Sequence, residues 1–291
     1  MNRSQIKYSS GLVLFGLNGV VSSQIALSSM NIVLFRTLLG SAFLMLLFVW
    51  RRQPLQLPAQ PRQLAAAALS GVSMGLSWIF LYEAYQRIGV GLSSIAYYCG
   101  PVIVMLLTPL VFHKKITAIQ KLCFGVVFLG IVLISVPDLM GNAAVDLFGL
   151  LCGFASAVLH ALMVIFTMKA PAVTGLKNSM IQLTVSFLTV AAFSVALHNI
   201  CAPSGMQQWG WMLILGIVNT GIGCYLYFAE IARIPVETVS ILGYLEPLSA
   251  VVFAVLLLHE HLSCYELLGA GLIACGALVS ERAQTVPTDV S

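Results

Sequence analysis

Residues 87–101 read RIGVGLSSIAYYCGP, and residues 233–247 read RIPVETVSILGYLEP. A shift of 146 positions places the first stretch on the second, and the match continues over residues 82–134 and 228–280. Twelve of these 53 aligned positions are identical: Arg87/Arg233, Ile88/Ile234, Val90/Val236, Ser94/Ser240, Ile95/Ile241, Tyr98/Tyr244, Pro101/Pro247, Leu110/Leu256, His113/His259, Leu122/Leu268, Gly125/Gly271 and Gly130/Gly276. Shared apolar composition explains some of these identities, but not the paired Arg, Tyr, Pro and His. The pattern indicates a duplicated structural unit.

The composition is that of a membrane protein. The chain of 291 residues is 59% hydrophobic and only 8% charged, with a mean hydropathy of +0.98. A soluble domain of this length carries far more charge, so we expect a polytopic helical protein surrounded by lipid. No basic helix with interleaved aromatic residues is present, and a nucleic-acid partner is therefore not expected.

Ten apolar segments divide the chain, each close to the ~20 residues that cross a bilayer as a helix. They lie near residues 9–27, 30–50, 64–86, 90–112, 119–136, 147–168, 178–198, 208–230, 236–258 and 264–281. Helices are the expected spanning element because lipid offers no partners to an open backbone. The predicted fold is an all-α membrane protein with ten transmembrane helices.

The distribution of Lys and Arg predicts the orientation. With the N-terminus in the cytoplasm, only Arg87 falls outside and Arg36 falls within the second span. The cytoplasmic side then receives Arg3, Lys7, Arg51, Arg52, Arg62, Lys114, Lys115, Lys121, Lys169, Lys177, Arg233 and Arg282. This excess follows the positive-inside rule and predicts that both termini and the Lys114-Lys115 turn are cytoplasmic, whereas Asn142 and His259-Glu260-His261 face out.

The repeat divides the chain into two halves. We expect a first five-helix repeat over residues 1–140, a second over residues 141–282, and a short cytoplasmic tail over residues 283–291. An odd number of spans per copy forces the two copies to cross the membrane in opposite directions. Inverted halves of this kind are the architecture of many secondary transporters, which bind their solute between the halves near the midplane.

Ionisable residues within the predicted spans are candidates for function, because burying a charge in lipid is costly. Glu246 lies at the centre of the ninth span, where low dielectric favours the protonated carboxyl, and it is the leading coupling residue. His160 in the sixth span and Glu83 in the third are further coupling candidates. Pro247 and its repeat equivalent Pro101 are predicted hinges. The alternatives are a structural hydrogen bond for Glu246 and His160, and static kinks for the prolines.

Aromatic residues gather in the same spans and predict a solute site. The candidate substrate-binding residues are Trp78, Tyr82, Tyr97, Tyr98, His160, Tyr225, Tyr227 and Tyr244. Tyr98 and Tyr244 are repeat-equivalent and could face one another across the pseudo-two-fold axis. For Tyr82 and Tyr227 the alternative is anchoring at the membrane interface. Arg36 is expected to snorkel to the outer interface, and the alternative is that it pairs with a carboxylate. On the sixth span, a stripe of small and polar residues, including Gly149, Gly153, Ser156 and Thr167, predicts close helix packing.

Neither a metal site nor a cofactor is expected. Adjacent residues on a helix end diverge, so His259-Glu260-His261 is interpreted as a solvated cap rather than a ligand set. No glycine-rich phosphate-binding loop is present. Cys201 and Cys264 both fall near the predicted outer face, where a disulfide between them is an open alternative.

Several of these motifs resemble the EamA-type family of the drug/metabolite transporter superfamily. They are Leu245-Glu246-Pro247-Leu248, Leu258-His259-Glu260-His261-Leu262, Gly269-Ala270-Gly271 through Gly276, and Phe35-Arg36-Thr37. The resemblance covers essentially the whole chain. It implies ten spans in two inverted halves, a central cavity, and alternating access without ATP. A tryptophan often found in the middle of the family's sixth span is replaced near His160.

The expected function is secondary active transport by alternating access in the bacterial plasma (inner) membrane. The leading expectation is export of a small metabolite such as an amino acid or amine. Protons are the candidate coupling ion. A monomer or weak dimer is the expected working form. Import or exchange of a cationic or quaternary amine is an alternative. A membrane-embedded lipid-headgroup enzyme is disfavoured because it needs acids, His or Arg clustered at one interface. A channel is disfavoured by the single asymmetric Glu246.

Overall fold

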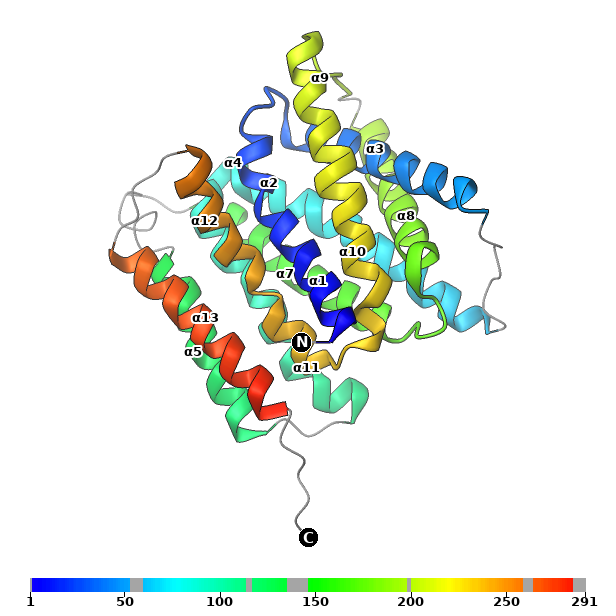
Figure 1. Ribbon diagram of the computed structural model, residues 1–291. Helices are drawn as coiled ribbons and strands as arrows, with labels where there is room; N and C mark the ends of the chain where they lie inside the picture. The colour runs from blue at the N-terminus through cyan, green and yellow to red at the C-terminus, as the bar shows by residue number, and fades with distance from the viewer. Residues whose placement is uncertain are drawn as a thin grey trace.

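The computed structural model describes residues 2–52, 60–113, 117–134, 146–197, 200–258 and 264–284, and all regular secondary structure in these ranges is helical (Figure 1). The helices are α1 (Arg3–Gly16), α2 (Asn18–Ser22), α3 (Ser29–Trp50), α4 (Pro61–Phe112), α5 (Ala118–Ile134), α7 (Leu147–Met168), α8 (Gly175–Ala196), α9 (Gly205–Leu213), the π-helix η1 (Ile214–Ile222), α10 (Gly223–Glu230), the 3₁₀ helix η2 (Ile231–Arg233), α11 (Val236–Leu242), α12 (Leu245–Leu258) and α13 (Cys264–Gln284). The predicted all-α class is confirmed. The Lys114-Lys115 turn, Asn142, His259-Glu260-His261 and most of the tail lie outside the described residues.

Six described stretches are long and apolar enough to cross a bilayer. They are Ser29–Trp50, Pro61–Ile88, Leu147–Met168, Gly175–Ala196, Gly205–Arg233 and Val236–Leu257. Ala96–Phe112 and Lys121–Gly130 are shorter apolar helices. Each of the ten predicted segments overlaps one or more of the described helices, and the chain is a multi-pass membrane protein.

The outer surface of the bundle is apolar, as contact with lipid requires. Two repeat-equivalent pairs illustrate this. Leu110 and Leu256 are 73% and 62% exposed, and Leu122 and Leu268 are 69% and 62% exposed. These two identities of the repeat therefore belong to the outer surface and not to the core.

The first predicted span, 9–27, is wrong in its limits. Helix α1 already begins at Arg3, where a capping box between Asn2 and Gln5 satisfies two free backbone N–H groups. The helix ends at Gly16 and a short second helix, α2, follows Leu17. A Cβ at Gly16 would overlap the Ser249 side chain of α12, so only glycine permits this close approach.

The predicted spans 64–86 and 90–112 are two apolar stretches, Pro61–Ile88 and Ala96–Phe112, of a single helical element, α4. The chain nevertheless reverses direction within it, as its contacts with α7 demonstrate. Along the first leg, residues 61–88, the contacts run antiparallel, from Ser70–Thr167 through Ser77–Ser156 to Ile88–Gly149. Along the second leg, residues 96–112, they run parallel, from Ala96–Gly153 to Gly100–His160. The change of direction therefore falls between Ile88 and Ala96, a stretch whose sequence includes Gly89 and Gly91, and glycine is a weak helix former.

The stripe predicted on the sixth span is a packing face. Gly149, Gly153, Ser156 and Thr167 are all buried against α4. Ser77 and Ser156 exchange hydrogen bonds with one another's backbone carbonyls, at 2.9 Å each. Small residues let the backbones approach, and short hydroxyl bonds join the helices where lipid supplies no alternative partner.

The predicted eighth span, 208–230, is irregular at its centre. Between α9 and α10 the backbone makes the nine-residue π-helix η1. Within it, the Thr220 hydroxyl donates to the carbonyl of Leu215 at 2.8 Å. π-Helical turns frequently occur at functional sites, where they redirect a side chain. Here the redirected side chain is Thr220, which faces Arg36 of α3.

Helices from the two parts of the chain interlock. Helix α1 packs against α10 and α12, and α7 packs against the two legs of α4. Helix α3 packs against η1, the first leg of α4 packs against α8, and α3 packs against α8. Helices α5 and α13 lie side by side at the lower left of Figure 1. The packing of α1 on α10 and α12 corresponds, in the repeat, to the packing of α7 on the two legs of α4. The packing of α3 on η1 corresponds to the packing of α8 on the first leg of α4.

The α5–α13 contact is reciprocal at the level of residues. A Cβ at Gly130 would lie 2.7 Å from the carbonyl oxygen of Gly269 and 2.9 Å from Ile273. A Cβ at Gly276 would lie 3.1 Å from the carbonyl oxygen of Cys123 and 2.5 Å from Val127. Under the shift of 146 positions, Gly130 becomes Gly276, Cys123 becomes Gly269 and Val127 becomes Ile273. Both glycines therefore let one helix backbone approach the other in the same way.

Candidate functional site

Two adjoining pockets lie at the centre of the bundle. The inner pocket, of about 40 Å³, has a mostly apolar wall that includes Phe15, Met74, Met163, Tyr227 and Phe228. The outer pocket, of about 250 Å³, is more polar and reaches the surface at the exposed residues Gly19 and Ser23. The walls of the two pockets share Asn18, Trp78, Tyr97 and Glu246. These four residues come from α2, the two legs of α4, and α12, so the site is built from both predicted repeats.

Arg36 of α3 is buried and does not snorkel, which corrects the sequence-based expectation. Only 2% of the residue is exposed, and it lines the outer pocket. Its Nε donates to the Thr220 hydroxyl at 3.0 Å, and its Nη1 donates to the Tyr82 hydroxyl at 2.7 Å. Its guanidinium carbon lies 4.6 Å from the centroid of the Trp78 ring. These contacts hold the guanidinium inside the bundle, although Arg36 lies near the start of α3.

Glu246 lies in the first turn of α12 and lines both pockets. No hydrogen bond or ion pair joins its carboxylate to another residue in the described part of the chain. The structural hydrogen bond that was the alternative interpretation is therefore not made to any described side chain or backbone group. The carboxylate is available to a proton, a water molecule or a cationic solute.

Tyr97 and His160 form the polar part of the inner wall. The Tyr97 hydroxyl lies 2.8 Å from Nδ1 of His160, and the two rings meet edge to face with centroids 5.0 Å apart. His160 has Gly100 as a neighbour, since a Cβ at that glycine would lie 3.0 Å from its ring. This contact joins the second leg of α4 to α7 and fixes the direction in which the imidazole points.

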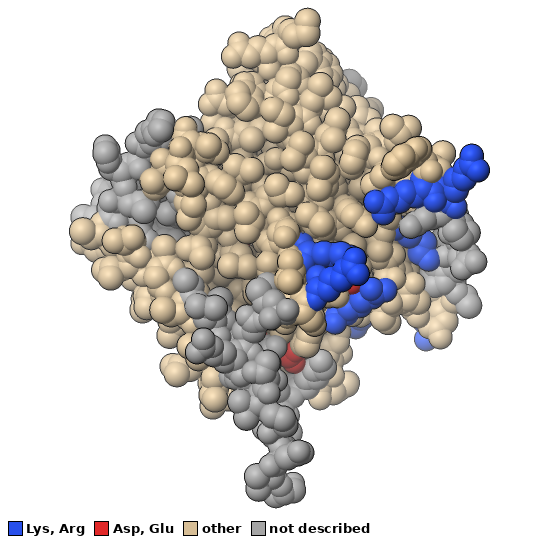
Figure 2. Space-filling model, in the orientation of Figure 1, with Lys and Arg blue, Asp and Glu red and all other residues tan. Residues whose placement is uncertain are grey.

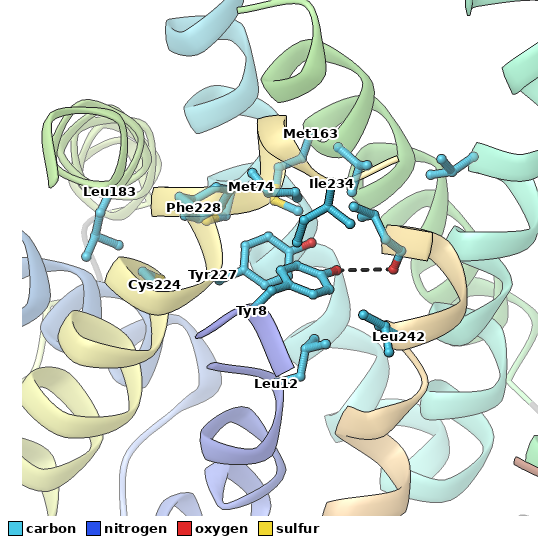
Figure 3. Packing of buried hydrophobic residues seen from close by; sticks show 14 of the residues in the cluster. Tyr8, Leu12, Met74, Met163, Leu183, Cys224, Tyr227, Phe228, Ile234 and Leu242 are labelled. Atoms are coloured by element: carbon cyan, nitrogen blue, oxygen red, sulfur yellow. Dashed lines mark hydrogen bonds between the residues drawn. The ribbon is translucent and has the colours of Figure 1, made fainter. Parts of the chain in front are cut away.

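Two tyrosines, Tyr8 and Tyr227, lie next to one another in the buried cluster drawn in Figure 3. The rings of Tyr8 in α1 and Tyr227 in α10 lie with centroids 4.8 Å apart and planes tilted by 40°. The Tyr8 hydroxyl donates to the backbone carbonyl of Val239 in α11 at 3.2 Å. Tyr8 is 1% exposed and Tyr227 is 3% exposed, so both rings are packed inside the bundle.

A cluster of charged residues lies at the start of α1. In the first ion cluster, defined as Ser4, Lys7, Glu230 and Arg233, the Glu230 carboxylate accepts from Lys7 at 2.8 Å, from Ser4 at 3.0 Å and from Arg233 at 3.0 Å. The Glu230 side chain is only 9% exposed. The cluster ties the start of α1 to the end of α10.

A second ion cluster, defined as Glu83, Arg87 and Asp146, has the same design. The Arg87 guanidinium donates to the carboxylate of Glu83, which lies one turn earlier in α4, at 2.6 Å. It also donates to the carboxylate of Asp146, which precedes α7, at 3.2 Å. The hydrogen bond from Arg87, together with the one from the backbone N–H of Phe148, holds the pKa of the Asp146 carboxyl below its usual range. All three side chains are about 40% exposed, in contrast to Glu230.

The predicted site residues divide into two groups. Trp78, Tyr82, Tyr97, His160, Tyr227 and Glu246 line one or both pockets. Tyr98, Tyr225, Tyr244 and Glu83 are absent from both linings. The two predicted hinge prolines lie in α4 and α12, with Pro101 3.7 Å from a Cβ placed on Gly243. Within the described residues, no group of three His, Cys, Asp or Glu could hold a metal ion.

The residues outside the pockets have other neighbours. The Tyr244 hydroxyl donates to the backbone carbonyl of Tyr98 at 3.4 Å, so the repeat-equivalent pair does meet, but Tyr244 is directed at Phe124 of α5. Tyr225 lies 5.9 Å below the guanidinium of Arg51. Glu83 belongs to the second ion cluster. Cys201 and Cys264 are both exposed free thiols.

Sequence reasoning missed Asn18, which lines both pockets and accepts hydrogen bonds from Arg36 at 3.4 Å and Asn219 at 3.3 Å. Its signal was present, since an amide within an apolar segment needs a partner. Tyr8 and Met74 were also missed. Tyr8 precedes the predicted first span, and Met74 cannot be told from ordinary core by its residue type.

The chain resembles known transporters over nearly its full length. The EamA-like transporter family matches residues 9–136 and 147–281. The uncharacterized transporter YxxF of Bacillus subtilis is 27% identical over 96% of this chain and 90% of its own length. The uncharacterized transporter YoaV of the same organism is 22% identical over 84% of each chain, and an uncharacterized transporter of Archaeoglobus fulgidus is 25% identical over 68% of this chain and 70% of its own. A solved crystal structure has the same fold, with a TM-score of 0.82 over 96% of this chain and 98% of that chain at 17% identity.

Proposed function

This chain belongs to the EamA-like transporter family, and we propose that it is a secondary active transporter that exports a small metabolite, such as an amino acid or an amine, by alternating access. Family membership and the names of its relatives point to a membrane transporter rather than an enzyme. The observation that carries the proposal is the pair of central pockets, which are lined from both parts of the chain and contain the unpaired Glu246. A solute bound there contacts both parts, so their relative movement can expose it to either side.

The proposed moving units are two inverted five-helix halves, residues 1–140 and 141–282. Three observations support them. The two ranges matched by the family fall one in each half. The packing of α1 on α10 and α12 is the counterpart of the packing of α7 on the two legs of α4. Gly130 and Gly276 make reciprocal contacts between α5 and α13.

The two ion clusters are the proposed gates. Arg233 and Arg87 are equivalent in the repeat, and each bonds an acid that lies three or four residues earlier in the chain. Each cluster also reaches the beginning of the other half's first helix, at Lys7 or at Asp146. The acid of the first cluster, Glu230, is 9% exposed, whereas the acids of the second cluster, Glu83 and Asp146, are 40% and 38% exposed. The outer pocket reaches the surface near Tyr85 of α4. This asymmetry fits a state that is closed at the first cluster and open towards the second.

The proposed location is a bacterial plasma membrane, with both termini in the cytoplasm. On the face drawn in Figure 2, Lys and Arg gather around the position of the N-terminus marked in Figure 1 and along the end of the bundle to its right, and none is visible around α9 at the top. The positive-inside rule places that basic end in the cytoplasm. The first ion cluster is then the cytoplasmic gate, and the structure is open to the outside. The proposed working form is a monomer or a weak dimer.

Coupling to protons is proposed to run through Glu246, with His160 as the second candidate. Glu246 faces both pockets without a partner among the described residues, so it can bind either a proton or the cationic group of a solute. Competition between the two makes solute release depend on protonation from the side to which the pocket is open. Pro101 and Pro247 are the proposed hinges, because proline removes a backbone hydrogen bond within a span.

Transport in proteoliposomes tests the proposal. The purified protein is reconstituted and the vesicles are loaded with a mixture of unlabelled amino acids and amines. Uptake of a labelled member of the mixture is measured without ATP, with and without a pH gradient. The proposal expects saturable exchange that the gradient enhances. Uptake equal to that of protein-free vesicles for all members would contradict it, and covalent change of a lipid headgroup would indicate the enzyme instead.

A further inference from the structure

Arg36 carries a buried positive charge that forms no ion pair with a described residue, although the Glu246 carboxylate lines the same outer pocket. Arg36 is 2% exposed, and none of the ion pairs among the described residues includes it. Its partners are the neutral oxygens of Thr220, Tyr82 and Asn18 and the face of the Trp78 ring. A buried charge is normally compensated by an opposite charge at close range. The outer pocket, which Arg36 lines, is the place from which such an anion can come.

The hydrogen-bonding capacity of Arg36 is only partly used. A guanidinium has five N–H donors, and three of them bond to Thr220, Tyr82 and Asn18. Five minus three leaves two donors for a ligand. The bond to Asn18 is also long, at 3.4 Å, and is readily exchanged. A carboxylate is the planar anion that pairs with guanidinium in a two-bond arrangement.

The guanidinium is held in place before any ligand arrives. Trp78 lies 4.6 Å below it, and Tyr82 and Thr220 fix two of its nitrogens from different helices. The unusual backbone of η1 directs Thr220 at Arg36, and a Thr220 hydrogen bond to Leu215 secures that hydroxyl. A fixed donor loses little conformational entropy on binding, which favours a tight contact.

We propose that the transported solute is a zwitterion with a carboxylate and an amino group, as in an α-amino acid, and that Arg36 binds its carboxylate in the outer pocket. The proposal rests on the transport function proposed above and selects between the amino acid and the amine left open there. The amino group is bound by Glu246, which lines the same pocket and has no ionic partner among the described residues. Two unpaired charges of opposite sign in one pocket complement a solute that carries both.

The size of the outer pocket agrees with this class. Its volume of about 250 Å³ is below the ~300–1,000 Å³ typical of sites for drug-sized ligands. The adjoining inner pocket has an apolar wall and only about 40 Å³. A small apolar side chain fits there, next to Met74 and Met163, while the charged end of the solute stays in the outer pocket.

Ligand chemistry on the unaltered protein gives the first test. Thermal unfolding of the purified protein is measured with a panel of proteinogenic L-amino acids, their carboxamides and their decarboxylated amines. We expect at least one amino acid to raise the midpoint of unfolding, and its amide and amine to bind at least about tenfold more weakly, as the loss of charge-assisted hydrogen bonds implies. Equal protection by an amine or amide would overturn the proposal, and so would a panel in which no amino acid protects.

A conservative variant assigns the effect to Arg36. Arg36→Lys keeps the charge but loses the two-bond geometry, and is expected to weaken amino-acid binding about tenfold or more while leaving any binding of the matched amine unchanged. The control is Arg51→Lys, since Arg51 is exposed at the opposite end of α3. Unchanged amino-acid affinity in a folded Arg36→Lys protein would remove Arg36 from the site. Exchange of an amine in proteoliposomes, with no effect of amino acids, would remove the carboxylate contact but leave the transport function standing.

Discussion

The Tyr97 hydroxyl lies 2.8 Å from Nδ1 of His160, and this contact joins the second leg of α4 to α7 within the wall of the inner pocket. It therefore connects the two proposed halves at the point where a solute would pass. Any movement that separates α4 from α7 must lengthen or break it. We therefore expect the contact to link affinity for the solute to the relative position of the proposed halves.

We expect Tyr97→Phe to weaken solute binding about three- to tenfold, because it removes one hydrogen bond worth about 1 kcal/mol. Tyr244→Phe is the matched control. It deletes a hydroxyl whose bond to Tyr98 is long, at 3.4 Å, and which does not line either pocket. Isothermal titration or thermal shift with a transported solute measures both. A control that weakens binding as much as Tyr97→Phe would place the effect outside the pocket.

Glu246→Gln is expected to keep the fold and passive exchange of solute, but to abolish accumulation driven by a pH gradient. Glutamine retains the shape of the side chain and cannot bind or release a proton. Uptake is compared in proteoliposomes with and without the gradient, at equal protein density. If the variant still accumulates solute when the gradient is applied, the coupling role passes to His160.

Alanine at Gly130 or Gly276 is expected to destabilise the α5–α13 contact by about 1–3 kcal/mol, because overpacking forces the backbones apart. A Cβ at these positions would lie 2.7 Å from the Gly269 carbonyl oxygen or 2.5 Å from Val127. Gly125→Ala and Gly271→Ala are matched controls in the same two helices, since a Cβ there has no heavy atom within 4 Å. Thermal unfolding measures all four, and equal effects at the four sites would contradict the packing described.

The two ion clusters are expected to differ in their contribution to stability. Glu230→Gln removes a buried acid with three partners and should cost about 1–3 kcal/mol. Asp146→Asn keeps the helix cap on α7 and loses only an exposed charge pair, so its effect should be small.

The pH dependence of the second cluster follows from the pKa of Asp146. Because the folded state lowers that pKa, the stabilisation by Asp146 is complete above the usual carboxyl pKa and is lost as the pH falls through the lowered value. The difference in stability between wild type and Asp146→Asn should therefore vanish at acid pH. A difference that persists there would assign the effect to something other than the charge.

Periodicity and charge predicted the helical membrane class, the approximate position of the spans, and the packing face that includes Gly153 and Ser156. They also predicted several pocket residues, among them Trp78, Tyr97, His160 and Glu246. These residues stand out because aromatic and ionisable groups within apolar segments need a specific neighbour.

Other features depend on contacts that a single sequence does not contain. Arg36 was expected at the membrane interface because it lies near the end of a predicted span. Its contacts with Thr220, Tyr82 and Trp78 hold it inside the bundle instead. The Tyr244 hydroxyl donates to the Tyr98 carbonyl, yet neither residue lines a pocket, because tertiary packing decides which side chains face it. The single helical element α4 also could not be predicted, since Gly89 and Gly91 suggest a break.

The central claim is that the pocket between the halves opens to the two sides of the membrane in turn. Cys224 reports on it directly, because it is buried in the wall of the inner pocket. A variant that keeps Cys224 and replaces the other six of the seven cysteines is reconstituted and treated with a small membrane-impermeant thiol reagent from each side. The account predicts that Cys224 is modified from both sides and that a bound solute slows the reaction. It also predicts that Lys7→Gln, which weakens the first ion cluster, accelerates modification from the cytoplasmic side. Modification from one side alone, unchanged by solute and by Lys7→Gln, would contradict alternating access.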